Sequence, residues 1–364
     1  MIFKLLDLDT FITCRLVSKD WKEIIDTIKD DNVWKYFLYN NFSTKYRSYA
    51  RKSKLPYYKL FKNIAAWNKP TQVTIAIGPS NGAFIINMHV YKDNLIVIYD
   101  DCVMYLNTEN FKVKKFIKKK YKDLNESDHM IVILKRSDVL LLYGKAEGRN
   151  WESNQILPSV DHQDITVYKL EDDKCYFVTD NRSVFVCEWN NLKWKQTFLA
   201  KYQGNDTITD INIFDKEIHV ITTYCKVYKV VLDEKRLDLC FSVTVVELLA
   251  GPFMFDKYSF GYAVCPQEDI VDISEDSGFI TIGQQDLTCL LQHGDIIILG
   301  HACGRIDLFS FKSVLGSDRF RPLQITTIPH GKNIRAIDIY ENENSHFLYL
   351  LTDDVIMTYI FTFS

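Results

Sequence analysis

The stretch Asp295-Ile296-Ile297-Ile298-Leu299, followed after a short turn by Gly304-Arg305-Ile306-Asp307-Leu308-Phe309-Ser310, decides the fold. Both halves are rich in β-branched and other apolar residues, and a turn that contains glycine separates them, which predicts two consecutive strands. The apolar residues run almost continuously instead of alternating with polar ones. Such runs indicate strands that are covered on both faces.

The same strand–turn–strand unit recurs from Thr71 onward. Its other copies comprise residues 93–99 with 103–106, 138–143 with 165–168, 175–178 with 184–186, 217–221 with 227–230, and 347–350 with 355–359. The copies start near 95, 139, 176, 218, 296 and 348, so successive starts differ by 44, 37, 42, 78 and 52 residues. The long interval predicts a hidden copy, for which residues 261–264 with 270–273 are the best candidate.

Seven copies of roughly 40 residues indicate a β-propeller, in which each unit supplies one blade of four strands. We therefore predict a mainly β fold with a propeller at residues 71–364, seven-bladed, with six or eight blades left open. Residues 304–310 and 164–168 resemble the third strand of the WD40 repeat, Gly-x-Ile-x-Leu-Trp-Asp. The chain contains no Trp-Asp dipeptide, so the predicted propeller is a divergent, WD40-like one.

The first 70 residues show helical periodicity instead. Thr10 or Asp9 can cap a first helix, Ser18 can cap a second, and Asp31 or Asn32 can begin a third. In the second helix, apolar residues at positions 21, 24, 25 and 28 fall on one face. We predict three short helices within residues 1–42 and a helical linker at residues 43–70, where Pro56 can occupy a first turn.

Part of this helical region resembles the F-box. The resemblance is carried by Leu6-Asp7-Leu8-Asp9-Thr10-Phe11, by Arg15-Leu16-Val17-Ser18-Lys19-Asp20-Trp21 and by Val33-Trp34. The family pattern runs Leu-Asp, a spaced Leu, Val-Cys/Ser-Lys-x-Trp and then Leu-Trp. The family's opening Leu-Pro-x-Glu segment is reduced here to Ile2-Phe3-Lys4-Leu5, which predicts an N-terminally shortened F-box.

This resemblance implies a substrate-recognition adaptor of an SCF-type (Skp–cullin–F-box) E3 ubiquitin ligase, with an unidentified target protein on the propeller. A Skp-family adaptor and a cullin are the implied partners, and the chain itself performs no catalysis. The implied adaptor-binding residues are Leu5, Leu6, Phe11, Leu16, Val17, Lys19, Trp21 and Trp34. One alternative is a non-catalytic propeller scaffold whose degenerate F-box no longer joins the ligase. Another is a generic three-helix cap with Trp21 and Trp34 in its core.

Charge is unevenly spread along the chain. Residues 1–70 carry 14 Lys and Arg against 7 Asp and Glu, a balance of +7, so with a net charge of −3 the remainder carries −10. This asymmetry indicates two units with different surfaces. The densest cluster comprises seven lysines within residues 112–122. We predict a solvated outer strand or loop there, with nuclear import or an anionic partner as alternatives; nucleic acid binding is not expected.

The sequence shows no motif for bond chemistry or for a cofactor. His293, His301 and Cys303 form the closest group of metal-type ligands, but zinc needs a fourth ligand, so no metal site is expected. The nine cysteines are widely spaced and odd in number, which is typical of reduced thiols. No apolar run is long enough to span a membrane. A cytoplasmic or nuclear location is therefore expected.

Overall fold

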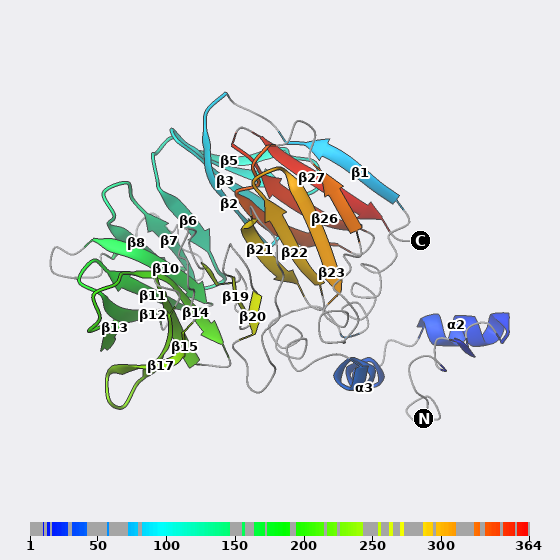
Figure 1. Ribbon diagram of the computed structural model, residues 1–364. Helices are drawn as coiled ribbons and strands as arrows, with labels where there is room; N and C mark the ends of the chain where they lie inside the picture. Colours follow the sequence, from blue (N-terminus) through cyan, green and yellow to red (C-terminus); the bar gives the residue numbers. More distant parts are fainter. Residues whose placement is uncertain are drawn as a thin grey trace.

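The structure is a computed structural model of the chain. It describes residues 10, 13–14, 17–27, 31–41, 57, 72–78, 82–145, 155–156, 164–171, 173–189, 194–214, 217–223, 226–242, 254–255, 262–264, 270–272, 287–293, 296–310, 324–327, 332–342, 345–353 and 355–362. Two helices precede the strands, α2 (Lys19–Thr27) and α3 (Asp31–Asn41), and they lie outside the ring of sheets (Figure 1).

The first half of the ring contains four sheets of four strands each. The first blade is β2 (Ile85–Tyr91), β3 (Asn94–Tyr99), β4 (Val103–Asn107) and β5 (Val113–Ile117). The second is β6 (Asp123–Glu126), β7 (Met130–Leu134), β8 (Leu140–Gly144) and β9 (Gln155–Ile156). The third is β10 (Ile165–Glu171), β11 (Lys174–Thr179), β12 (Ser183–Trp189) and β13 (Trp194–Lys201). The fourth is β14 (Ile208–Phe214), β15 (Glu217–Thr222), β16 (Lys226–Val231) and β17 (Arg236–Ser242).

The second half begins with a three-stranded sheet, β18 (Met254–Phe255), β19 (Tyr262–Val264) and β20 (Ile270–Asp272). The penultimate blade is β21 (Leu287–His293), β22 (Ile296–His301), β23 (Arg305–Ser310) and β24 (Gln324–Thr327). The closing blade is β25 (Ala336–Glu341), β26 (Ser345–Leu351) and β27 (Ile356–Thr362), completed by β1 (Gln72–Ile77). The described residues thus form six complete four-stranded blades and one three-stranded sheet, arranged as a β-propeller (Figure 1).

The ring is closed by strands from opposite ends of the propeller. β1 pairs antiparallel with β27 over six residue pairs, from Gln72 opposite Thr362 to Ile77 opposite Met357. β25, the first strand of the same blade, lies beside β2 of the first blade. Because β1 is the outermost strand of a blade that otherwise comes from the C-terminus, the first and last parts of the propeller cannot separate without breaking a sheet.

Four innermost strands share a bulge at the same place. In β2, β10, β14 and β21 the register with the second strand shifts directly after the first residue. In three of these strands the extra residue is a threonine: Thr166, Thr209 and Thr288. Each threonine hydroxyl donates to a carbonyl of the second strand, over 3.0 to 3.3 Å. A bulge increases the local twist of a strand. The shared bulge therefore gives the innermost strands of these four blades the same twist at their first residues.

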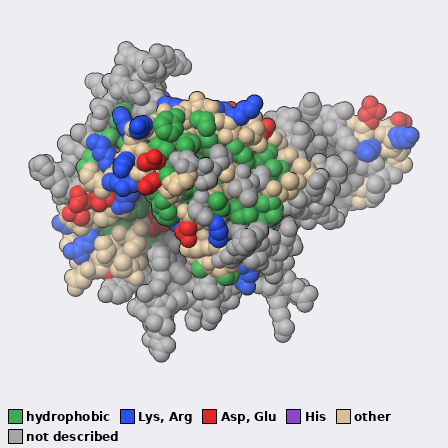
Figure 2. All heavy atoms as spheres, turned by 90° about the horizontal axis from the view of Figure 1, so that it is seen from above, with side chains coloured by type: hydrophobic (Ala, Val, Ile, Leu, Met, Phe, Trp, Pro, Cys, Tyr) green, Lys and Arg blue, Asp and Glu red, His purple; other side chains and the backbone are tan. Residues whose placement is uncertain are grey.

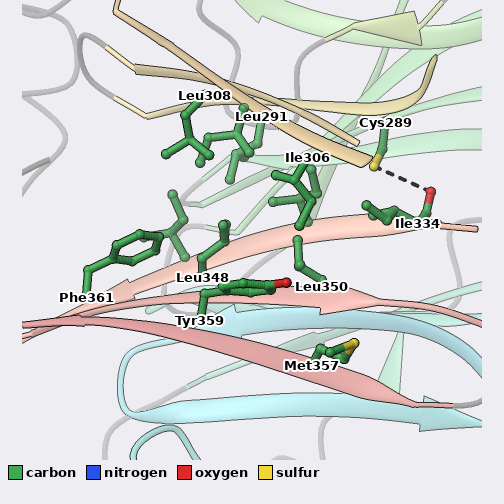
Figure 3. Close-up of a cluster of buried hydrophobic side chains, with 13 residues drawn as sticks. Cys289, Leu291, Ile306, Leu308, Ile334, Leu348, Leu350, Met357, Tyr359 and Phe361 are labelled. Atoms are coloured by element: carbon green, nitrogen blue, oxygen red, sulfur yellow. Dashed lines mark hydrogen bonds between the residues drawn. The ribbon is translucent and has the colours of Figure 1, made fainter. Parts of the chain in front are cut away.

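Apolar side chains fill the spaces between blades. Figure 3 shows one such cluster between the penultimate and closing blades, where Ile306 and Leu308 of β23 lie opposite Leu348 and Leu350 of β26. All four side chains are buried. The second strands explain the continuous apolar runs of the sequence, because both faces of each strand meet a neighbouring blade and β3 is buried at five of its six positions.

A partly buried carboxylate joins three consecutive blades. Asp123 of β6 accepts hydrogen bonds from Asn87 Nδ2 at 3.2 Å and from the Tyr168 hydroxyl at 2.7 Å, and it contacts His89 Nε2 at 2.8 Å. Burial alone would raise the pKa of Asp123, but His89, Tyr168 and the amide of Leu124 outweigh it, so that the pKa is lowered. Asn87 and His89 lie on β2 and Tyr168 lies on β10, so this one side chain ties the first, second and third blades together.

Most of the predicted strand pairs are confirmed, including the hidden copy, which forms β19 and β20. The copy that paired residues 138–143 with 165–168 is wrong. β8 pairs with β7 and β9, whereas β10 is the innermost strand of the next blade. Residues 164–168 are therefore not a third strand, although residues 304–310 are, because β23 is the third strand of its sheet. The second blade's first strand was missed because β6, Asp-Leu-Asn-Glu, carries no apolar run. Its second strand, β7, is a wholly apolar run that was overlooked.

Within the described residues, no helix is both long and apolar enough to cross a membrane.

Replacement of Asp123 by Ala should destabilise the propeller by about 1–3 kcal/mol, because it leaves partly buried polar partners without their acceptor. The control is Asp93→Ala, which removes an exposed carboxylate paired with Lys114 and should cost less than about 1 kcal/mol. Urea unfolding followed by tryptophan fluorescence measures both midpoints. Equal shifts in the two variants would contradict the role given to Asp123.

Stability should also depend on pH through Asp123. Folding lowers the pKa of Asp123 below that of an unfolded Asp, which is about 3.9. The stabilisation is therefore complete above the unfolded pKa, and it is lost as the pH falls through the lower pKa of the folded state. Thermal unfolding midpoints measured between about pH 6 and pH 2.5 should fall less steeply for Asp123→Asn than for the unaltered chain. Parallel curves would show that other carboxylates carry the acid response.

Ring closure can be tested by two truncations that differ by one strand. A chain that begins at residue 70 keeps β1, and a chain that begins at residue 79 lacks it. Loss of six paired residues should cost on the order of 3–6 kcal/mol and expose the edge of β27. The shorter chain should unfold at lower urea concentration and aggregate more, as measured by light scattering; indistinguishable behaviour would contradict closure by β1.

Candidate functional site: an exposed apolar face on the N-terminal helices

Helix α2 begins at a capping serine, as the sequence predicts. The Ser18 hydroxyl oxygen accepts a hydrogen bond from the Trp21 amide at 3.1 Å, and the Ser18 carbonyl accepts one from the Lys22 amide at 3.0 Å. Asp20 lies in the first turn, where a negative charge is favourable to the helix dipole. The cap fixes where the helix starts and therefore which side chains share a face.

Three apolar side chains near the start of α2 are exposed together. Val17 is 67% exposed, Trp21 41% and Ile24 51%. Trp21 and Ile24 are three residues apart in α2 and therefore lie on one side of it, while Val17 comes just before the capping residue Ser18. Ile25, the next residue, is only 2% exposed and lies about 100° further round the helix, where α2 is packed. Large apolar side chains that stay in water on one helix face indicate a surface that a partner covers.

The sequence placed Trp21, Ile24 and Ile25 on one face of the helix, and the structure exposes two of them and buries the third. Ile25 is core, whereas Trp21 and Ile24 are surface. The sequence did not single out Ile24 as exposed, because a helical period tells which residues share a face but not whether that face is covered. The sequence feature that could have indicated exposure is the width of the apolar stripe, which is greater than one neighbouring helix can cover.

Helix α3, in contrast to α2, buries most of its described apolar side chains. Val33, Trp34 and Phe37 are buried, with exposures of 7%, 7% and 1%. The Trp34 and Phe37 rings meet edge to face with centroids 6.4 Å apart. The Lys35 ammonium lies 5.6 Å from the ring centre of Tyr57, so the predicted linker contacts α3 at this position. Trp34 is therefore a buried residue that packs against Phe37 of its own helix.

The eight sequence-predicted contact residues separate into three groups. Val17, Lys19 and Trp21 are exposed at the start of α2. Trp34 is core. The remaining four lie outside the described residues: Leu5, Leu6, Phe11 and Leu16. Whether any of the eight binds an adaptor stays a prediction.

The propeller carries exposed apolar and charged side chains of its own. Figure 2 shows hydrophobic side chains gathered beside basic and acidic ones on the face seen from above. The lysine cluster lies where the sequence predicted it, partly on β5, which is the outer strand of the first blade, and partly in the loop that follows. Lys118, Lys119 and Lys120 of that loop are exposed, and Lys122 pairs with Asp138 at 2.5 Å.

The histidine and cysteine groups do not form a metal centre in the part of the chain that the structure describes. His301 is buried and its Nε2 contacts Asp307 Oδ2 at 3.2 Å, while Cys303 is exposed. The side chain of His293 is not described. The seven described cysteines are free thiols. His301 is therefore a buried residue of the penultimate blade that contacts Asp307 of the neighbouring strand.

Comparison with known proteins supports both halves of this architecture. Residues 1–32 match the family model of the F-box domain. The fold is similar to the β-propeller domain of Cps50 (Swd1) from Myceliophteria thermophila, with a TM-score of 0.56 and 8% identity over 80% of this chain and 98% of that one. It is also similar to the computationally designed Ika8 protein, with a TM-score of 0.51 and 11% identity over 79% of this chain and 98% of that one. No curated protein matches the chain significantly in sequence.

The chain thus combines two modules. An F-box domain occupies residues 1–32, and a β-propeller follows it. Proteins with this pairing are generally adaptors: the F-box contacts a Skp-type adaptor and a cullin complex, and the propeller contacts another protein.

Proposed function

We propose that this chain is the substrate receptor of an SCF-type E3 ubiquitin ligase. The observation that carries the proposal is the exposed apolar stripe of Val17, Trp21 and Ile24 at the start of α2, within residues that match the F-box domain. Burying three such side chains against a partner contributes about 1.5–3 kcal/mol each, enough to anchor a specific interface before its costs are subtracted.

The contact with a Skp-family adaptor extends beyond this stripe. The predicted apolar residues Leu5, Leu6, Phe11 and Leu16 precede it in the sequence and belong to the same F-box match. Lys19 adds an exposed positive charge beside the stripe. We expect these residues and the stripe to bind the adaptor together, and the cullin to be recruited through that adaptor.

The propeller is proposed to hold the target protein. Its rigid ring of sheets supports surface loops that differ from blade to blade, which suits recognition of one particular protein. The ligase then raises the effective concentration of a target lysine near the charged ubiquitin carrier, so no residue of this chain needs to make or break a bond. No cofactor is required by this function.

The proposal places the protein in the cytoplasm or the nucleus. Free thiols in the described residues support this placement, because buried cysteines such as Cys175 and Cys187 persist as thiols in a reducing compartment. Burial raises the pKa of Cys187 to about 12, so this thiol stays protonated and unreactive.

The contact with the adaptor is tested by the double variant Val17→Asp and Ile24→Asp. Introducing two carboxylates into the stripe should reduce co-purification of a Skp-family adaptor and of cullin at least tenfold, because both charges would have to be buried unpaired. Affinity purification with quantitative mass spectrometry, under proteasome inhibition, measures adaptor, cullin and accumulated target together.

The matched control is Leu232→Asp, which replaces a 54% exposed leucine in a turn of the fourth blade. It should leave adaptor and cullin binding unchanged. Absence of adaptor and cullin from the unaltered chain, with other proteins still bound to the propeller, would instead support a scaffold whose F-box no longer joins the ligase.

A further inference from the structure

A cleft of about 500 Å³ lies between the third and fourth blades. Beside the cleft the two blades are in contact through a shared apolar cluster that includes Leu199 of β13 and Val230 of β16. The cleft is lined by the end of β13, by the loop that joins the blades, and by the hairpin of β16 and β17. Its volume is in the range of sites that bind ligands.

The floor of the cleft is a fixed polar network. The Tyr202 hydroxyl donates to Asp206 and lies 3.2 Å from the Tyr228 hydroxyl. The Arg182 guanidinium holds the loop above by donating to the Gly204 carbonyl. A Cβ at residue 204 would collide with the Tyr202 hydroxyl, so glycine is required there. The cleft is therefore preformed.

Basic side chains dominate the walls. Four lining residues are basic and only Asp206 is acidic. Arg236 is held by Glu234 and Asp238 over 2.8 Å, but none of the ion pairs within the described part of the chain involves the three lysines, Lys201, Lys226 and Lys235. Burial alone would raise the pKa of Asp206, but Thr222, Tyr202 and Lys226 outweigh it, so that the pKa is lowered. Groups of the protein itself therefore stabilise the negative charge of Asp206.

The basic groups lie at the two ends of one hairpin. Lys226 begins β16, and Lys235 immediately precedes Arg236, which pairs with Val231 at the far end of β16. Five residues of strand span roughly 17 Å. Leu237, which is only partly buried, lies between these ends. An occupant that satisfies both ends is therefore elongated, negatively charged at its two ends and apolar in the middle.

We propose that this cleft, between the third and fourth blades, binds an extended acidic peptide segment of a partner protein, with carboxylates about five residues apart. The lysines at each end form charge-assisted hydrogen bonds with the carboxylates, and Tyr202, Tyr228 and Leu237 contact the residues between them. This inference goes beyond the ligase role and does not require it, because the cleft belongs to the propeller alone.

The probe is a fluorescein-labelled, end-capped peptide, Glu-Glu-Ser-Leu-Ser-Glu-Glu, titrated into the full chain and followed by fluorescence anisotropy. Two comparison peptides test the chemistry: Gln-Gln-Ser-Leu-Ser-Gln-Gln removes the charge, and Glu-Glu-Glu-Glu-Ser-Leu-Ser keeps the charge but removes the spacing. We expect saturable binding of the first peptide and binding at least about tenfold weaker for the other two, the loss of roughly one charge-assisted contact or more.

The site is tested by the double variant Lys226→Glu and Lys235→Glu, which should weaken binding of the first peptide at least tenfold. The matched control is Lys118→Glu with Lys119→Glu, an equal charge change on the loop after β5, which should leave binding unchanged. Thermal unfolding confirms that the variants are folded. If the first double variant is unfolded, Lys201→Gln with Lys235→Gln replaces it, since both side chains are exposed.

Three results would overturn the proposal: no saturable binding to the folded chain, equal binding of the charged and neutral peptides, or equal weakening by the two charge-reversal pairs. The last result would indicate general attraction to a basic surface. Co-purification of the Skp-family adaptor should be the same for the cleft variants as for the unaltered chain, so failure of this inference and failure of the ligase proposal are seen in different measurements.

Discussion

The pairing of β1 with β27 is the constraint on which the rest of the propeller depends. A ring of blades has no natural end, and an open ring would leave one apolar blade face in water. Here a strand from the start of the propeller completes the blade from its end, so the sheet itself supplies the closure.

Packing between blades is apolar at its centre and polar at selected points. The apolar clusters supply most of the stabilisation, but they are made of similar residues in every blade and specify neighbours weakly. Asp123 and the Tyr202–Asp206–Tyr228 group differ from this repeat. Each needs particular partners on the adjacent blades, so each favours one order and register of blades over others that would bury similar apolar area.

The two candidate contact surfaces follow different physical rules. The stripe at the start of α2 is apolar and lies on a short helix that could not be stable alone, so its partner adds both affinity and order. The cleft between the third and fourth blades is basic, preformed and supported by strands. Binding there costs the propeller little reorganisation, so electrostatic complementarity decides which segment is accepted.

The sequence by itself determined the two-part organisation, the strand pairs of most blades and the cap at Ser18. These depend on local patterns: apolar runs of strand length, turn residues between them, and a serine before a helical period. The misassigned copy at residues 138–168 shows where the local signal ended, because a polar innermost strand and a long connection carry no pattern.

Only the tertiary structure decided which apolar residues are covered, which is why Ile25 and Ile24 differ although they are adjacent. It alone brought Lys226 and Lys235 to one cleft with Lys201, and it alone joined Asn87, Asp123 and Tyr168. These contacts link residues on different strands or blades, and burial and proximity at that range are set by the whole ring rather than by the neighbouring sequence.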